Sequence, residues 1–266
     1  MSTPLETSFR VRVDVTNPGQ FFACCGLLEL AARMKPGAQG WFSEGFFHVG
    51  HGPTLAELIG SLHRAVLLQT DSEDTTASPI HISAPFELRL DWWKGGERAS
   101  SDLKVWAGTM ESFRIARAMQ HALHAEVFTS EDLLDIGQVA YDPEDGTKKV
   151  EPFYFDARRG PNAHSRDVGF APNDLGLTTI ASPAVELLCL IGLQRARPIP
   201  VFRQPRIFDY HVWMRPLPPS LVPVATAGLL PDSAGHGYRF ESWFRTGQRK
   251  HKAFITAKRK PSFSPS

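Results

Sequence analysis

The basic residues near the C-terminus are the side chains of this sequence best suited to bind phosphate. Between positions 239 and 260 the chain has eight lysine and arginine residues and one acidic residue, Glu241. This segment carries a local charge of +7, whereas the whole chain carries +1, so the remainder is mildly acidic. Such an asymmetry indicates a basic arm that can contact a partner of opposite charge. The binding candidates in it are Arg245, Arg249, Lys250 and Lys252.

A second group of basic and aromatic residues lies between positions 91 and 124. The apolar pattern predicts a helix over 109–126, whose basic face carries Arg114, Arg117, His121 and His124. A lysine and three tryptophans precede this helix, namely Trp92, Trp93, Lys104 and Trp106. Cations that bind phosphates and rings that stack on bases are the two requirements of single-strand binding. The alternative is that the tryptophans are core residues and the arginines are solvated. On the binding interpretation the contacts come from Lys104, Trp106, Arg114 and Arg117.

The stretch from 153 to 175 is a third candidate, a polar loop in which arginines occur among glycines and asparagines. Its Arg158, Arg159 and Arg166 could clamp a phosphate backbone. Aspartates in the same loop would either order these arginines through ion pairs or make the loop purely structural. A metal site is a weaker alternative, because the spacing of its three ligands is not specific: Asp156, His164 and Asp167. We expect no metal and no other cofactor.

The Gly-His-Gly turn at 235–237 is the best place in this sequence for acid–base chemistry. In a metal-independent ribonuclease a general base deprotonates a 2′-hydroxyl, and His236 and Tyr238 are the candidates for that work. The two glycines would let a backbone approach closely. One histidine in a glycine-rich turn is a weak signal, so we expect no catalytic residue and keep this pair as the alternative.

Two of the three cysteines, Cys24 and Cys25, are adjacent in NPGQFFACCGLLELAAR (17–33). Neighbouring residues of a helix point about 100° apart, so the two thiols cannot share a metal ion. A bond between them would distort the backbone. Packing is therefore the favoured role for both, and for Cys189 in a second apolar helix. Three cysteines without a regular spacing are typical of a reducing cytosol.

The composition is that of an ordinary globular protein with a sizeable core: 266 residues, 42% hydrophobic and 21% charged. No stretch approaches the roughly 18 apolar residues that a membrane span needs, and the N-terminus has no signal-peptide pattern. We therefore expect a cytoplasmic protein that does not contact a membrane. The sequence motifs of phosphate-binding loops, dinucleotide folds, zinc peptidases and serine hydrolases are absent.

The elements that must position these residues alternate irregularly between strands and helices. Strands are predicted over 9–15, 81–93, 150–157, 206–214, 238–245 and 252–259, and 39–50 is a strand pair or a bent strand. Helices are predicted over 18–33, 54–69, 109–126 and 182–197. This order predicts an α+β fold in which antiparallel sheets pack against helices. Gly26, inside the first helix, predicts a close approach to a sheet. We expect an α+β core over 1–200, a strand-rich basic part of the same domain over 201–260, and a disordered tail over 261–266.

Three stretches, considered together, resemble a known family. They are NPGQFFACCGLLELAAR (17–33), LKVWAGTMESFRIARAMQ (103–120) and FYFDARRGPNAHSRDVGFAPND (153–174), which runs into SPAVELLCLIGLQRARP (182–198). As a set they resemble the third Csb family of the CRISPR-associated proteins of subtype I-U, also called I-G. The resemblance covers roughly residues 8–200.

The resemblance implies a subunit of an RNA-guided, Cascade-like interference complex in antiviral defence. Its partners would be guide RNA or target DNA and the other Cascade subunits. Relatives in such complexes are often built from ferredoxin-like, RNA-recognition-type units, and two such halves would suit the α+β order. The short Gly-His-Gly turn departs from that pattern. We expect a non-catalytic nucleic-acid-binding subunit, with a CRISPR RNA-processing endoribonuclease and a protein–protein scaffold as alternatives.

Overall fold

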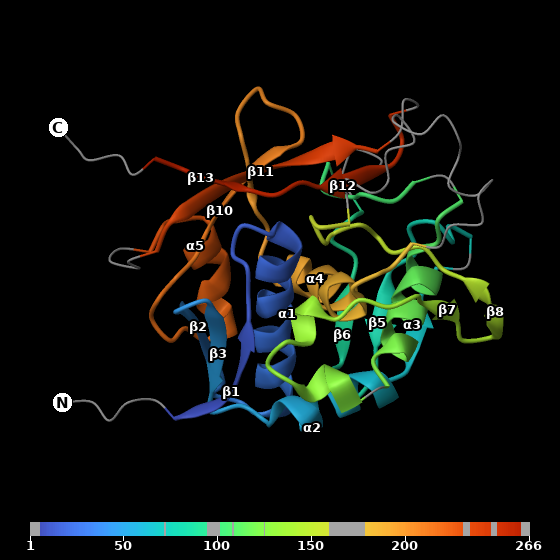
Figure 1. The fold of residues 1–266 in the computed structure, drawn as a ribbon, viewed down its shortest axis with the longest axis horizontal. Coiled ribbons are helices and arrows are strands. Elements are labelled where there is room, and N and C mark those ends of the chain that lie inside the picture. The colour runs from blue at the N-terminus through green and yellow to red at the C-terminus, as the bar shows by residue number, and fades with distance from the viewer. Residues whose placement is uncertain are drawn as a thin grey trace.

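Two buried helices, α1 (Pro18–Met34) and α4 (Pro183–Arg195), pack against each other at the centre of the structure, with small sheets around them (Figure 1). The coordinates are a computed structural model. The residues that it describes are 6–71, 73–94, 102–107, 109–124, 126–159, 179–230, 235–245 and 249–261. The tail from 262 onward therefore lies outside the described residues.

The N-terminus of α1 follows directly from its sequence. The side-chain oxygen of Asn17 accepts a hydrogen bond from the backbone of Gly19 at 3.1 Å, and Pro18 occupies the first helical turn. Nearly every residue from Pro18 to Ala31 is buried, as expected for a helix that is apolar on all sides. The helix predicted over 18–33 is confirmed. The cysteines in it are free and buried, in agreement with a packing role.

Glycines set the close packing of α1 and α4. A Cβ atom added at Gly26 would overlap the carbonyl oxygen of Leu188, and one added at Gly192 would overlap the carbonyl oxygen of Phe22. The predicted close approach at Gly26 therefore exists, but its partner is a helix and not a sheet. Glu29 of α1 adds an ionic link to this contact, because its buried carboxylate bonds Arg195 of α4.

Two three-stranded antiparallel sheets lie beside the helices. In the first, β1 (Thr7–Arg12), β2 (Gln39–Ser43) and β3 (Phe46–Gly50) have the order β1-β3-β2. In the second, β4 (Leu67–Gln69), β5 (Ile80–Ile82) and β6 (Leu88–Leu90) follow chain order. A separate exposed hairpin is formed by β7 (Tyr141–Asp142) and β8 (Asp145–Lys149).

The C-terminal sheet lies along the upper side of the molecule in Figure 1. It contains β9 (Ile199–Pro200), β10 (Ile207–His211), β11 (Gly237–Phe244), β12 (Lys252–Phe254) and β13 (Lys258–Arg259). The eight-residue strand β11 is its axis. It pairs with β10 along one edge, and with β13 and then β12 along the other. The strand-rich character predicted for this part of the chain is confirmed.

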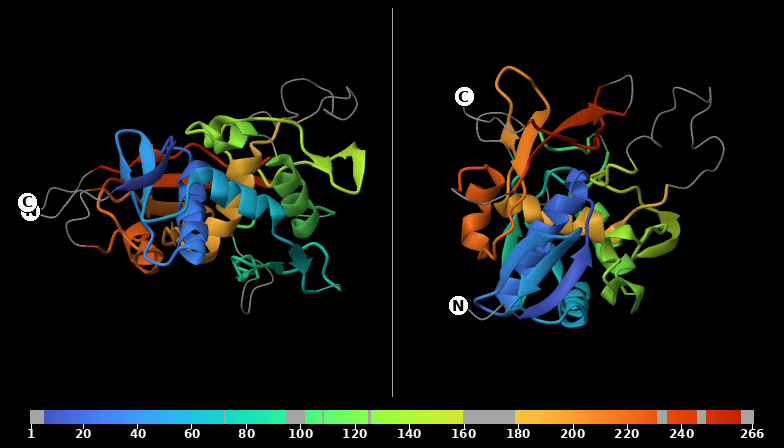
Figure 2. Two further views of the ribbon diagram at one scale, coloured as in Figure 1. Left: turned by 90° about the horizontal axis from the view of Figure 1, so that it is seen from below. Right: turned by 60° about the vertical axis from the view of Figure 1, so that its left-hand side comes forward.

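Three shorter α-helices complete the described structure: α2 (Leu55–Arg64), α3 (Ser112–Ala122) and α5 (Val222–Thr226). Three single turns of 3-10 helix span Glu126–Thr129, Leu133–Asp135 and Pro219–Leu221. In the described part of the chain no helix is long and apolar enough to cross a bilayer. The two views of Figure 2 show the sheets on different sides of the central helices. The fold is α+β with several small antiparallel sheets, as predicted.

Some predicted boundaries are wrong, each for an identifiable reason. The helix expected over 54–69 ends at Arg64, because residues 67–69 pair with β5 as a strand. The strand expected over 81–93 is divided into β5 and β6. The strand expected over 150–157 is irregular, because its backbone N–H groups bond side chains of the central helices.

Candidate functional site

The tryptophans expected to stack on bases belong to the core. Trp92, Trp93 and Trp106 are all buried and contact one another edge to face. Each indole N–H donates a hydrogen bond to a backbone carbonyl oxygen. The acceptors for the three tryptophans, in the same order, are the carbonyl oxygens of Leu190, Ala77 and Thr76. The assignment of Trp106 as a binding residue is therefore corrected, because its ring has no free face for a base.

The two arginines of α3 are neutralised by the β7–β8 hairpin. Arg114 Nε lies 2.9 Å from a carboxylate oxygen of Asp142, and Arg117 bonds the carboxylate of Glu144 at 2.5 Å. A nucleic-acid phosphate would have to displace these carboxylates. Arg114 and Arg117 remain binding candidates from the sequence, but the structure gives them other partners.

Arg158 is part of an internal ionic network. Its guanidinium bonds the carboxylates of Asp156 and Asp135, and the carbonyl oxygen of Leu134. Burial alone would raise the pKa of Asp156, but the bonds from Arg158 outweigh it and lower that pKa. The ion-pair alternative for this loop therefore holds for Arg158. The neighbouring Arg159 donates to the hydroxyl of Ser182 at 3.3 Å. Arg166, His164 and Asp167 lie outside the described residues.

A buried carboxylate, Glu186 of α4, lies beside this network. It accepts hydrogen bonds from the backbone N–H groups of Phe155 and Asp156, at 3.2 and 3.1 Å. Burial raises its pKa to about 7, and these bonds only partly oppose that rise. Glu186 contacts backbone groups of an ordered segment, so it serves the fold and not a ligand.

Replacing Glu186 by glutamine is expected to remove a pH dependence of stability. Between about pH 4.5 and 7 the folded state holds more protons at Glu186 than the unfolded state, so stability falls as the pH rises through this window. The free energy of unfolding is measured with denaturant at about pH 5 and at about pH 8. From the lower to the higher pH, the wild-type protein should lose about 2 kcal/mol more of this free energy than Glu186→Gln. The exposed Glu73→Gln is the control. An equal change in the free energy of unfolding between the two pH values for Glu186→Gln and wild type would contradict the prediction.

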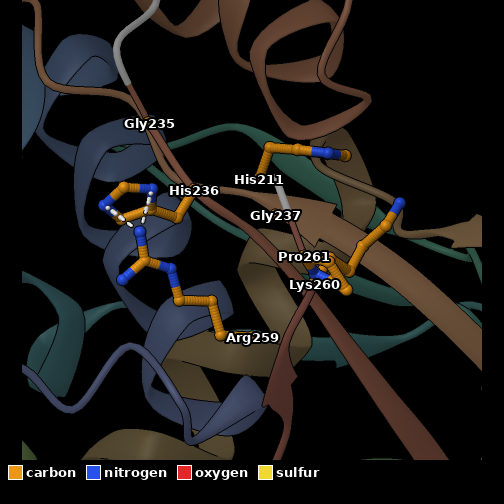
Figure 3. A pocket seen from close by; sticks show the side chains of 7 residues that line it. All are labelled: His211, Gly235, His236, Gly237, Arg259, Lys260 and Pro261. Atoms are coloured by element: carbon orange, nitrogen blue, oxygen red, sulfur yellow. Dashed lines mark hydrogen bonds between the residues drawn. The ribbon is translucent and has the colours of Figure 1, made fainter. Parts of the chain in front are cut away.

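His236 lies in a small pocket of about 250 Å³ at the N-terminal end of β11 (Figure 3). Its ring faces Arg259, whose Nη2 lies 2.8 Å from Nδ1, and points away from His211 on the other side of the pocket. Tyr238 is buried and stacks on Tyr210. Among the described residues no hydrogen bond joins His236 to Tyr238. The alternative catalytic pair is therefore not assembled in this structure.

Three other cations gather where β12 meets the segment 102–106, and we call Lys104, Arg206 and Lys252 the cation cluster. The backbone of Lys252 donates to Val105 at 2.9 Å, and its Nζ donates to the carbonyl oxygen of Asp102 at 2.6 Å. These bonds hold Lys104 close to Lys252. Arg206 enters from the start of β10, and its guanidinium lies 4.6 Å from the ring of Phe244.

The protonated, charged forms of the two lysines of the cation cluster are destabilised by their surroundings. Both are half-buried, and within the described residues no carboxylate forms an ion pair with either. Burial lowers the pKa of Lys104 against the opposing charge of Asp74. Burial also lowers the pKa of Lys252 to about 8; the charge of Asp102 opposes this shift, and those of Arg206 and Lys104 add to it. Arg206 has a distant acidic partner, Glu241 at 3.7 Å, and its buried Nε has no hydrogen-bond partner. The cluster thus has unused capacity for an anion.

The remaining predicted residues differ from one another in exposure. Arg245 is only 9% exposed, and its guanidinium carbon lies 3.5 Å from the centre of the Tyr154 ring. It is a packing residue, so its assignment to a binding surface is corrected. Arg249 and Lys250 are exposed, and in the described part of the chain neither has a carboxylate partner. They are separated from Lys252 by His251 alone and extend the positive charge of the cation cluster along the chain.

No protein-family model, no curated protein sequence and no solved structure matches this chain. Within the described residues, no group of three or more histidine, cysteine and acidic side chains could hold a metal ion. Sequence reasoning found Lys104 and Lys252 but missed Arg206. The signal available for it was VFRQPR (201–206), a polar turn between prolines that carries two arginines.

Proposed function

We propose that this chain binds the sugar-phosphate backbone of a nucleic acid at the cation cluster, with Arg249 and Lys250 at its edge. The observation that carries the proposal is the pair of half-buried lysines, Lys104 and Lys252, which lie close together and form no ion pair among the described residues, although the charges of Asp74 and Asp102 act on them from a distance. Two lysines kept close to each other and partly out of water are unfavourable for the isolated protein. A phosphate group between them would remove that penalty.

The other basic residues that the sequence predicts as binding candidates differ from the cation cluster, and this difference supports the cluster as the binding site. Arg114, Arg117 and Arg158 are each paired with an acidic side chain. At these places a phosphate has to compete with a carboxylate that is already bound. At the cation cluster it competes with water, with the carbonyl oxygen of Asp102 at Lys252 and with one carboxylate, that of Glu241, at 3.7 Å from Arg206.

We further propose that the nucleic acid is the guide RNA or target DNA of a type I-U Cascade-like complex, in which this chain is a non-catalytic subunit. The sequence resemblance supports this assignment. The element order β1-α1-β2-β3-α2, with sheet order β1-β3-β2, supports a ferredoxin-like origin for the N-terminal part, although β4 pairs in another sheet. Such a complex would act in the cytoplasm with other Cascade subunits as partners.

The test is a filter-binding titration of labelled RNA and DNA at about 50 and 200 mM salt. Replacing both Lys104 and Lys252 by methionine is expected to weaken binding at least about tenfold and to reduce the slope of log affinity against log salt by about two. The control removes two charges at a distance, through Lys35→Met with Arg64→Met at the ends of α1 and α2. It should change the affinity less than about twofold.

Other results of the same titration select the alternatives. An equal loss in the control variant would mean that the binding is a general charge effect and would contradict the proposed site. Cleavage of the RNA would move the assignment to the endoribonuclease and to His236. No binding at low salt would overturn the proposed function and favour a scaffold whose basic arm binds an acidic protein.

A further inference from the structure

The turn that joins β9 to β10 carries an aromatic ring out into solvent. Phe202 is 82% exposed, the largest value among the large hydrophobic side chains of the described residues. Figures 1 and 2 show this turn, drawn in orange, as a projection beyond the C-terminal sheet. Removing a phenylalanine ring from water is normally favourable. A ring held outside the fold is therefore available to a ligand.

The turn is ordered by its own backbone. Val201 donates to the carbonyl oxygen of Ile207 at 2.9 Å, Gln204 donates to Val201 at 3.1 Å, and Ile207 donates to Gln204 at 3.2 Å. Arg203 and Arg206 have positive φ angles of 58° and 67°. These values are uncommon for residues other than glycine, and such strain persists where the surroundings hold it in place. The backbone that carries Phe202 is thus held in a defined conformation.

The contact of the Phe202 ring within its own turn is with a cation. The guanidinium carbon of Arg203 lies 5.0 Å from the centre of the Phe202 ring. Arg206, four positions further on, belongs to the cation cluster, and its carbonyl oxygen accepts a hydrogen bond from Ser242 of β11 at 2.9 Å. The ring therefore stands beside the positive surface to which the phosphates are assigned.

We propose that Phe202 stacks on an unpaired base of a single-stranded nucleic acid whose phosphates bind the cation cluster. This inference rests on the proposed function and adds the class of ligand to it. Aromatic stacking beside a positive groove is the general means by which proteins hold single strands, because every base has a π-face. Bases inside a duplex are already stacked on their neighbours, so a protruding ring favours a strand whose bases are exposed.

The experiment separates bases from backbone. The probes are a labelled single-stranded oligonucleotide of about 12 nucleotides and an abasic strand with the same number of phosphates. The wild-type protein is expected to bind the base-bearing strand at least about fivefold more tightly than the abasic strand. Phe202→Ala should abolish this preference and leave the abasic affinity unchanged within about twofold. Phe202→Trp should keep the preference, and Phe202→Leu should not.

The measurements distinguish failure of the proposed function from failure of the stacking role of Phe202. If neither probe binds the wild-type protein, the proposed function fails and this inference fails with it. If both probes bind equally well, backbone binding stands and the stacking role of Phe202 is overturned. Retention of the base preference by Phe202→Ala would also overturn it. A thermal melt of each variant shows that the fold is intact, because the side chain of Phe202 is almost entirely outside the core.

Discussion

Gly26→Ala is expected to destabilise the protein by about 3 kcal/mol or more. The added methyl group would overlap the carbonyl oxygen of Leu188 in α4, which is backbone and cannot turn aside. The two central helices would have to move apart, and the contacts that bury them would loosen along their length. Gly192→Ala should have a similar effect, because its methyl group meets Phe22 of α1 at the same crossing.

The free energy of unfolding in urea measures this effect. Gly146→Ala is the control, since a Cβ atom at this exposed position of β8 meets nothing within 4 Å. It should change stability by no more than about 0.5 kcal/mol. The double variant of Gly26 and Gly192 should lose less than the sum of the single losses, because both act on one contact. A Gly26→Ala protein as stable as wild type would contradict the close packing of α1 and α4.

Lys252→Met is expected to stabilise the protein at neutral pH by about 2 to 3 kcal/mol while it weakens nucleic-acid binding. Methionine keeps the apolar part of the side chain and removes a charge that is half-buried beside Lys104 and Arg206. The lost bond to the carbonyl oxygen of Asp102 has a small cost, because that residue is exposed to water. Denaturant unfolding at pH 7 checks the gain, and Lys250→Met is the exposed control.

The pH dependence identifies the cause of the gain. The unfolded state holds a proton on Lys252 up to about pH 10.5, whereas the folded state holds it only up to about pH 8. Between these values the unfolded state holds more protons, so the wild-type protein gains stability as the pH rises, and its difference from Lys252→Met should shrink by about pH 10. A difference that stays constant from pH 7 to pH 10 would refute the assigned cause.

Local signals determined which helices could be predicted. The Asn-Pro start and the uninterrupted apolar sequence of α1 fix its position without help from the rest of the chain. The end of α2 was missed because residues 67–69 form a strand only when β5 is beside them. The apolar and aromatic residues of the segment at 150–157 predict a strand. Its conformation is instead set by bonds to Asn17 and Glu186, which are distant in sequence.

The sequence shows which residues of the candidate site are basic, but it does not show which of them are buried. The sequence identifies Lys104 and Lys252 as basic, yet only the fold shows that they are neighbours. Trp106 and Arg245 have the right residue types for binding, but they are buried, and composition does not reveal this. Nothing in the sequence distinguishes Phe202 from a core phenylalanine, and only the fold shows that it is exposed.

Strand β11 connects the turn that carries Phe202 with the strand that carries Lys252. Its Ser242 donates a hydrogen bond to the carbonyl oxygen of Arg206, and the same strand pairs with β12. The backbone of the turn that carries Phe202 and the backbone of Lys252 are therefore joined through one hydrogen-bonded framework, and their side chains supply the adjustment to a ligand. A bound strand would meet a nearly constant spacing between these two backbone segments. Much of the loss of conformational freedom would then fall on the nucleic acid, so a strand already extended to that spacing would bind more tightly than a collapsed one.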